Sequence, residues 1–264
     1  NARKFNGTID EVAIWNRSLT ADEIRSLYLG GLSLHRNDDN LVFSAGNATV
    51  TSDISSWSNN EWHHIAGSYG SSSATLYIDG DAKSTESFAE TSFIGNDTYI
   101  GGDWINSSAF SFNGILDEVR IYNRTLSSTE LDWSYNRGLE GKNTNVSSTG
   151  LVGEWHLNET SGTTAVDSSV ESNNGILYRF RFAPKYNASG GRFGGAFEFN
   201  GLDDWVSATT TGFNSEAGTL EAWFKPSTVA GNHTIFSIPQ EPAPVSAGLV
   251  LAMDFDGPYE TTDG

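Results

Sequence analysis

The 264-residue sequence contains no cysteine, only one methionine and few basic residues. The lack of cysteine excludes a disulfide framework, a cysteine-ligated metal site and thiol catalysis. Because 15 Lys and Arg stand against 33 Asp and Glu, the formal net charge is -18, and phosphate backbones and anionic lipids are repelled. We therefore expect no nucleic-acid partner. The longest apolar run, Ala247 to Met253, falls far short of the roughly 18 residues of a membrane span, so no membrane insertion is expected in this segment.

Asn-x-Ser/Thr triplets are about twice as frequent as the roughly five expected by chance. They begin at Asn6, Asn16, Asn47, Asn96, Asn106, Asn123, Asn145, Asn158, Asn187 and Asn232. One interpretation is that Asn, Ser and Thr simply suit turns and exposed strands. The interpretation we favour is N-glycosylation of an extracellular or cell-surface protein. Because the sequence combines predicted glycosylation sites with a complete lack of cysteine, it favours an archaeal or other prokaryotic cell surface over a eukaryotic ectodomain.

The sequence contains an internal repeat. Residues 5–31 align without gaps on residues 112–138, and 13 of the 27 positions are identical. Each copy predicts a strand with alternating apolar residues, followed by a short helix that begins at a capping box, Thr20 to Glu23 or Ser127 to Glu130. Most other segments read as short strands between turn residues. Periodicity alone therefore predicts an antiparallel all-β sandwich.

Two ordered series of motifs carry a family resemblance. They occupy residues 62–66, 76–80, 99–102 and 112–124 in one series, and 151–155, 162–169, 193–206 and 221–223 in the other. The first series resembles the second half, and the second series the first half, of a laminin-G-like, concanavalin A-like jelly-roll domain. The resemblance implies an all-β, antiparallel jelly-roll β-sandwich with short capped helices after the closing strands. The fold serves lectins, adhesins, enzyme appendages and structural proteins, so it does not by itself specify a function.

The halves occur in an unusual order, which suggests four segments. Residues 1–31 are interpreted as the closing strand and helix of one copy, 32–140 as the second half of a copy, 141–150 as a linker and 151–264 as the first half of a further copy. Residues 248–251 resemble 31–34 and are interpreted as the start of another second half. Three arrangements remain open: a piece of a tandem array, two halves of one sandwich in permuted order, or complementation between chains.

Catalysis is not expected. A sugar-cleaving site needs two carboxylates flanking the scissile bond, and the family-typical Glu-x-Asp-x-x-Glu is absent. Asp117 and Glu118 are adjacent, so they are predicted to face opposite sides of a strand.

Calcium is the one cofactor expected, in a structural role, because a hard cation takes several carboxylate and carbonyl oxygens from turns. By resemblance the candidate ligands are Asp167, Asn173, Asp10 and Asp117. The alternative is that Asp167 caps a turn and that Asp10 and Asp117 accept backbone hydrogen bonds.

Carbohydrate binding needs exposed aromatic faces beside amides and carboxylates, since a pyranose offers apolar C–H faces and a ring of hydroxyls. The candidates are Trp57 with Asn59 and Asn60, and Trp104, all in polar, loop-like stretches. The alternative for both tryptophans is that they fold back to cap the sandwich.

Two classes of function follow. The first is a structural or adhesive component of a filament, sheath or surface coat, with other copies of itself or further laminin-G-like repeats as partners. The second is a lectin-like, carbohydrate-binding module for surface glycans, attached to a larger surface protein or enzyme, with calcium as a candidate cofactor.

Overall fold

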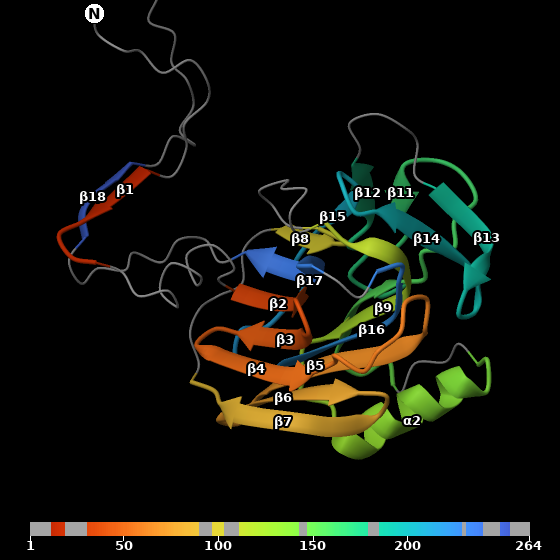
Figure 1. Cartoon of the computed structure of the whole chain (residues 1–264), viewed down its shortest axis with the longest axis horizontal. Helices are drawn as coiled ribbons and strands as arrows, with labels where there is room; N and C mark the ends of the chain where they lie inside the picture. The colour runs from red at the N-terminus through yellow and green to blue at the C-terminus, as the bar shows by residue number, and fades with distance from the viewer. Residues whose placement is uncertain are drawn as a thin grey trace, which may run out of the picture.

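The computed structural model describes residues 12–18, 31–89, 97–102, 111–142, 147–178, 185–228, 231–239 and 249–253. Most of these residues form two eight-stranded sheets that face each other as a sandwich (Figure 1). All pairs of named strands are antiparallel. The predicted jelly-roll β-sandwich is thus confirmed.

The first sheet contains the strand of the second repeat copy near its centre. In spatial order it runs β13 (Lys185–Gly191), β14 (Gly194–Asn200), β9 (Asn113–Tyr122), β16 (Gly218–Pro226), β5 (His63–Gly70), β6 (Ser73–Ile78) and β7 (Asp81–Ser87), and β10 (Leu151–Trp155) also pairs with β9.

The second sheet lies against the inner face of the first. In spatial order it runs β11 (Thr164–Ala165), β12 (Gly175–Tyr178), β15 (Trp205–Thr209), β8 (Asp97–Ile100), β17 (His233–Pro239), β2 (Gly31–Asn37), β3 (Asn40–Ala45) and β4 (Ala48–Asp53).

Each sheet contains strands from both segments, 32–140 and 151–264, which the sequence analysis placed on either side of a linker at 141–150. In the first sheet β9 lies between β14 and β16, and in the second sheet β17 lies between β8 and β2. The described strands of residues 32–140 and 151–239 therefore close into one sandwich.

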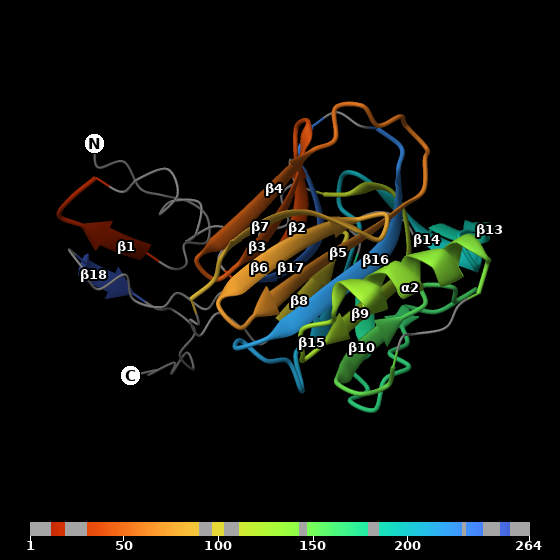
Figure 2. The ribbon, with the colours of Figure 1, turned by 90° about the horizontal axis from the view of Figure 1, so that it is seen from below.

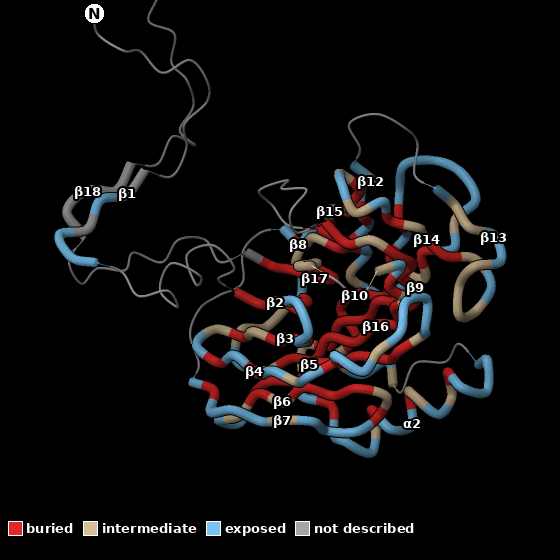
Figure 3. Tube along the Cα trace, in the orientation of Figure 1, coloured by how far each residue is buried: buried red, intermediate tan, exposed pale blue. Residues whose placement is uncertain are grey.

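The core is formed by every second residue of the strands, whose side chains point into the space between the two sheets (Figure 3). Its largest members include Phe43, Phe112, Trp155, Phe224 and Phe236, each at most 1% exposed. Close packing also explains why residue 67 is a glycine, because a Cβ atom on Gly67 would lie 2.2 Å from the ring of Phe43. Trp155 and Trp223 are buried, whereas Trp62 is half-buried.

One helix, α2 (Ser128–Leu139), follows β9 in the described part of the chain. Its capping box is formed as predicted, because Ser127 and Glu130 each bind the other's backbone N–H. The helix covers the outer face of the first sheet, where Leu126 and Leu131 pack with Tyr122 and Leu151 (Figure 2). The helix predicted for the first repeat copy lies outside the described residues.

Two further strands form a separate ribbon. β1 (Val12–Trp15), from the first repeat copy, pairs with β18 (Leu249–Met253) in a two-stranded sheet. β18 thus takes neither the partners nor the place of β2, which pairs with β3 and β17. The interpretation of residues 248–251 as the counterpart of 31–34 is corrected by this pairing.

Candidate functional site

A buried arginine lies at the centre of the outer face of the first sheet. Arg120 on β9 is 3% exposed. Its Nε lies 2.8 Å from Oε1 of Glu154 on β10, its Nη2 lies 2.5 Å from Oε2 of Glu118, and its Nη1 lies 3.6 Å from Oε1 of Glu221 on β16. These three carboxylates raise the pKa of Arg120 despite the opposing effect of burial. One cation thereby joins three adjacent strands.

Two histidines extend this ion network. Nδ1 of His156 lies 3.0 Å from both carboxylate oxygens of Glu118, and Nε2 of His64 lies 3.3 Å from Oε2 of Glu221. The hydrogen bond to Glu118 raises the pKa of His156. Burial alone would raise the pKa of Glu221, but the hydrogen bond and charge of His64, together with the charge of Arg120, lower it.

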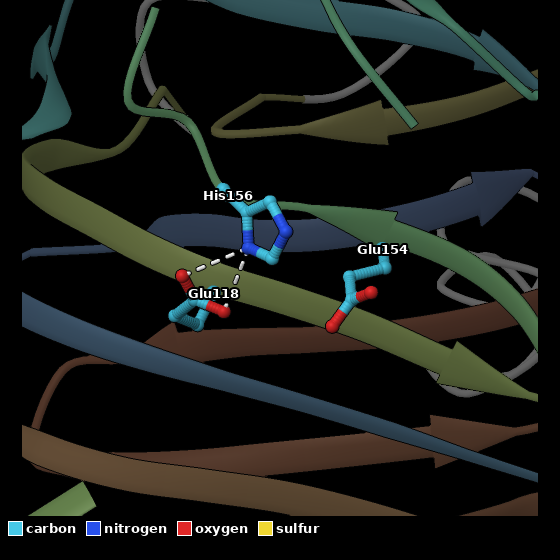
Figure 4. A group of neighbouring side chains, drawn as sticks. All are labelled: Glu118, Glu154 and His156. Atoms are coloured by element: carbon cyan, nitrogen blue, oxygen red, sulfur yellow. Dashed lines mark hydrogen bonds and ion pairs between the residues drawn. The ribbon is translucent and has the colours of Figure 1, made fainter. Parts of the chain in front are cut away.

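The side chains of Glu118, Glu154 and His156 offer three potential metal ligands within 4.8 Å of one another (Figure 4). Glu118 is held there by an unusual backbone conformation, with a φ of 54°. The guanidinium of Arg120 already binds both carboxylates, so it supplies the positive charge that an ion would otherwise bring.

Asp167 and Asn173 lie together, as the calcium hypothesis expected, but their polar groups hold a loop. Asp167 accepts hydrogen bonds from the backbone N–H groups of Glu154, Ser169 and Asn173 and from the hydroxyl of Ser169. The amide of Asn173 donates to two backbone carbonyls and accepts two further hydrogen bonds. This arrangement is the turn-capping alternative. Asp10 lies outside the described residues.

Asp117 differs from these two residues because one of its oxygens is unpartnered. Oδ2 accepts a hydrogen bond from the backbone N–H of Phe193, whereas Oδ1 is buried without a hydrogen-bond partner. Burial, followed by the charge of Glu118, raises the pKa of Asp117 to about 7, although backbone N–H groups oppose the shift. A buried carboxylate with a vacant oxygen is a chemically suitable ligand for a hard cation.

Trp57, the described candidate for sugar stacking, folds back onto the sandwich. Its ring stacks on His63 at 3.9 Å and contacts Phe224 at 5.5 Å. Asn59 is exposed, and the backbone N–H of Asn60 donates to the carbonyl of Pro226. This is the capping alternative for Trp57. Trp104 lies outside the described residues.

A different set of aromatic side chains forms an exposed patch. We define the aromatic patch as Tyr99, Ile176, Tyr178 and Trp205, on the adjacent strands β8, β12 and β15 of the second sheet. Tyr178 and Trp205 are register partners, and their rings are parallel within 8° at a centroid separation of 5.5 Å. Tyr178 is 42% exposed and Ile176 53%, while Tyr99 and Trp205 are half-buried.

Strand alternation explains why the patch faces outward. Val206, Ala208 and Ile100, which alternate with patch residues or their strand partners, belong to the core. Beside the patch a groove opens between the edges of the two sheets. Its lining is mainly apolar with two carboxylates: Leu177, Tyr178, Phe197, Glu198, Phe199, Asp204, Trp205 and Val206. Sequence reasoning treated Trp205 and Tyr178 only as strand residues, although their alternation with core residues was a usable signal.

Comparison with known protein families gives one match. Residues 29–132 match the family model described as the concanavalin A-like lectin/glucanases superfamily, of laminin-G type. No curated protein matches the chain. The matched segment runs from β2 into α2, and it carries a laminin-G-like jelly-roll fold that suits a lectin-like or adhesive module. No helix among the described residues is long and apolar enough to cross a membrane.

We expect Arg120→Met to reduce the free energy of unfolding by about 3 to 5 kcal/mol, because three carboxylates lose their buried cation. Urea unfolding at pH 7 measures the loss. The matched control is Arg137→Met, since Arg137 pairs with the half-exposed Glu140 on the surface of α2 and a surface pair contributes less than about 1 kcal/mol. Equal losses in the two variants would contradict the central role of Arg120.

Proposed function

We propose that this laminin-G-like sandwich is an extracellular adhesive module that binds carbohydrate on the aromatic patch. The observation that carries the proposal is the stacked pair of Tyr178 and Trp205, whose parallel rings lie at the surface. The apolar C–H face of a pyranose packs on such rings, while nearby polar groups bind the hydroxyls. Glu198, which pairs with Lys185 at 2.5 Å, and the buried Asp204 line the adjoining groove.

The negative charge of the chain limits the kinds of carbohydrate that we propose as ligands. With a formal net charge of -18, the protein repels sulfated or uronic-acid polymers. Neutral polysaccharides and neutral surface glycans are therefore the proposed ligands. We also propose that the module acts without catalysis, because both of the buried carboxylates of Glu118 and Glu154 form ion pairs with Arg120.

Binding to immobilised neutral polysaccharides, followed by titration calorimetry, tests this function. We expect Tyr178→Ala to weaken the affinity up to about tenfold, since one aromatic contact contributes about 0.5 to 1.5 kcal/mol. Trp133→Ala is the matched control, because Trp133 is 39% exposed but lies on α2, away from the second sheet. If Tyr178→Ala binds as tightly as the unaltered protein, the aromatic patch is not the binding surface.

We propose that calcium, if this module requires it, is bound at Asp117. The vacant buried oxygen of Asp117 supports this assignment, and the saturated hydrogen bonds of Asp167 and Asn173 argue against those two. Chelation should then lower the melting temperature of the unaltered protein, because a ligand of the folded state stabilises it. Asp117→Asn should melt at the same temperature with and without chelator. A melt of the unaltered protein that chelation leaves unchanged removes Asp117 from the candidates.

We further propose that the protein carries N-linked glycans, which favours its role as a component of a surface coat. Asn16, Asn47 and Asn158 are exposed, whereas Asn123, Asn187 and Asn232 are half-buried. Nδ2 of Asn123, the atom that a glycan would occupy, donates to the carbonyl of Gly212. Asn6, Asn96, Asn106 and Asn145 lie outside the described residues.

Peptide mapping of the protein isolated from its source tests the glycan proposal. We expect mass-shifted peptides at Asn47 and Asn158 and an unmodified peptide at Asn123, because a modified Nδ2 would displace the hydrogen bond to Gly212. Unmodified peptides at all three positions would rule out the proposed glycan cover and leave the carbohydrate-binding proposal untouched.

A further inference from the structure

The ribbon formed by β1 and β18 reproduces a pair of strands found inside the sandwich. β1 is the repeat counterpart of the last four residues of β9, at an offset of 107 residues. β9 pairs with β10 so that Tyr122, Ile121, Arg120 and Val119 face Leu151, Gly153, Glu154 and Trp155 in turn, with one residue of β10 bulged out. β1 pairs with β18 in the same register, with the bulge at the same place. β18 is therefore the counterpart of β10.

The buried ion pair of the sandwich is replaced on both strands of the ribbon. Arg120 and Glu154 are register partners in the sandwich. The corresponding partners in the ribbon are Ala13 and Ala252. Replacing only one member of a buried ion pair leaves an uncompensated charge, whereas replacing both removes the charge altogether. The joint replacement fits the equivalence of the two strand pairs.

One edge of β1 lacks the partner that β9 has at the same place. In the sandwich, β16 pairs along β9, with Leu220 facing Ile121 and Glu221 facing Arg120. Among the described residues, β1 pairs with β18 alone. Ile121 is 3% exposed, but its counterpart Ile14 is 50% exposed. A two-stranded ribbon of this kind is marginally stable and presents an open template for a third strand.

We propose that the open edge of β1 accepts an antiparallel strand of the β16 type from a further laminin-G-like repeat, as the start of a second sandwich. The repeat itself identifies the occupant, since β16 covers the same edge of β9. The chemistry of the occupant follows from Ala13. In the completed second sandwich a carboxylate at the position of Glu221 would lie opposite Ala13 and lack the cation that Arg120 supplies, so the incoming strand carries an uncharged residue there. β16 of a second copy of this chain carries Glu221 and is therefore disfavoured.

Two synthetic peptides test this specificity on the full chain by fluorescence anisotropy. One has the sequence of residues 217–227, and the other has the same sequence with Glu221→Ala. We expect saturable binding of the Glu221→Ala peptide and an affinity at least about tenfold weaker for the peptide with glutamate. A peptide in which Leu220, Ala222 and Phe224 are all replaced by aspartate controls for non-specific association.

The variant Ala13→Arg provides the decisive comparison. It restores a cation opposite the position of Glu221, so the preference should reverse toward the glutamate peptide. The main circular dichroism melting transition of the full chain should be unchanged by this substitution, because Ala13 lies in the ribbon and not in the sandwich. The proposal is overturned if neither peptide binds, if both bind equally well, or if Ala13→Arg leaves their order unchanged. None of these outcomes alters carbohydrate binding by Tyr178 and Trp205, so the two proposals fail separately.

Discussion

The ion pairs of Arg120 connect the parts of the chain from which the sandwich is built. Arg120 belongs to the segment that precedes residue 140, whereas Glu154 and Glu221 belong to the segment that follows residue 150. A buried guanidinium without carboxylates, or buried carboxylates without a guanidinium, would be strongly destabilising. The network therefore favours the one alignment of β10, β9 and β16 in which all the charges are paired. Around that alignment the described strands of the two segments close into one sandwich, and the helix α2 covers the sheet beside the network.

The two faces of the molecule have different roles as a consequence. On the outer face of the first sheet, Arg120 and the carboxylates of Glu118 and Glu154 are buried and paired with one another, so these side chains stabilise the fold. On the outer face of the second sheet, Tyr178 is exposed, whereas Tyr99 and Trp205 are half-buried. The physical distinction is accessibility: Arg120 and the three carboxylates around it are at most 7% exposed, whereas Tyr178 is 42% exposed.

Sequence reasoning reached some parts of this picture and missed others for identifiable reasons. The capping box at Ser127 and Glu130 was predictable because it depends on residues three apart. Trp57 was a plausible sugar-binding residue from its polar neighbours, but it stacks on His63, a contact that the local composition does not reveal. The association of Glu118 with Glu154 and His156 was out of reach, because it depends on β9 pairing with a strand about thirty residues further along the chain.

What the sequence by itself determined is the class of fold and the internal repeat, since alternation, turn residues and aligned identities are local or linear properties. Only the tertiary structure shows that the described strands on either side of residues 141–150 pair within one sandwich, because strand pairing joins edges that lie far apart in the sequence. It also shows that Asp167 holds a loop while one oxygen of Asp117 is buried without a hydrogen-bond partner. Both are acidic residues, and the difference lies in whether the surrounding chain brings hydrogen-bond donors to both carboxylate oxygens.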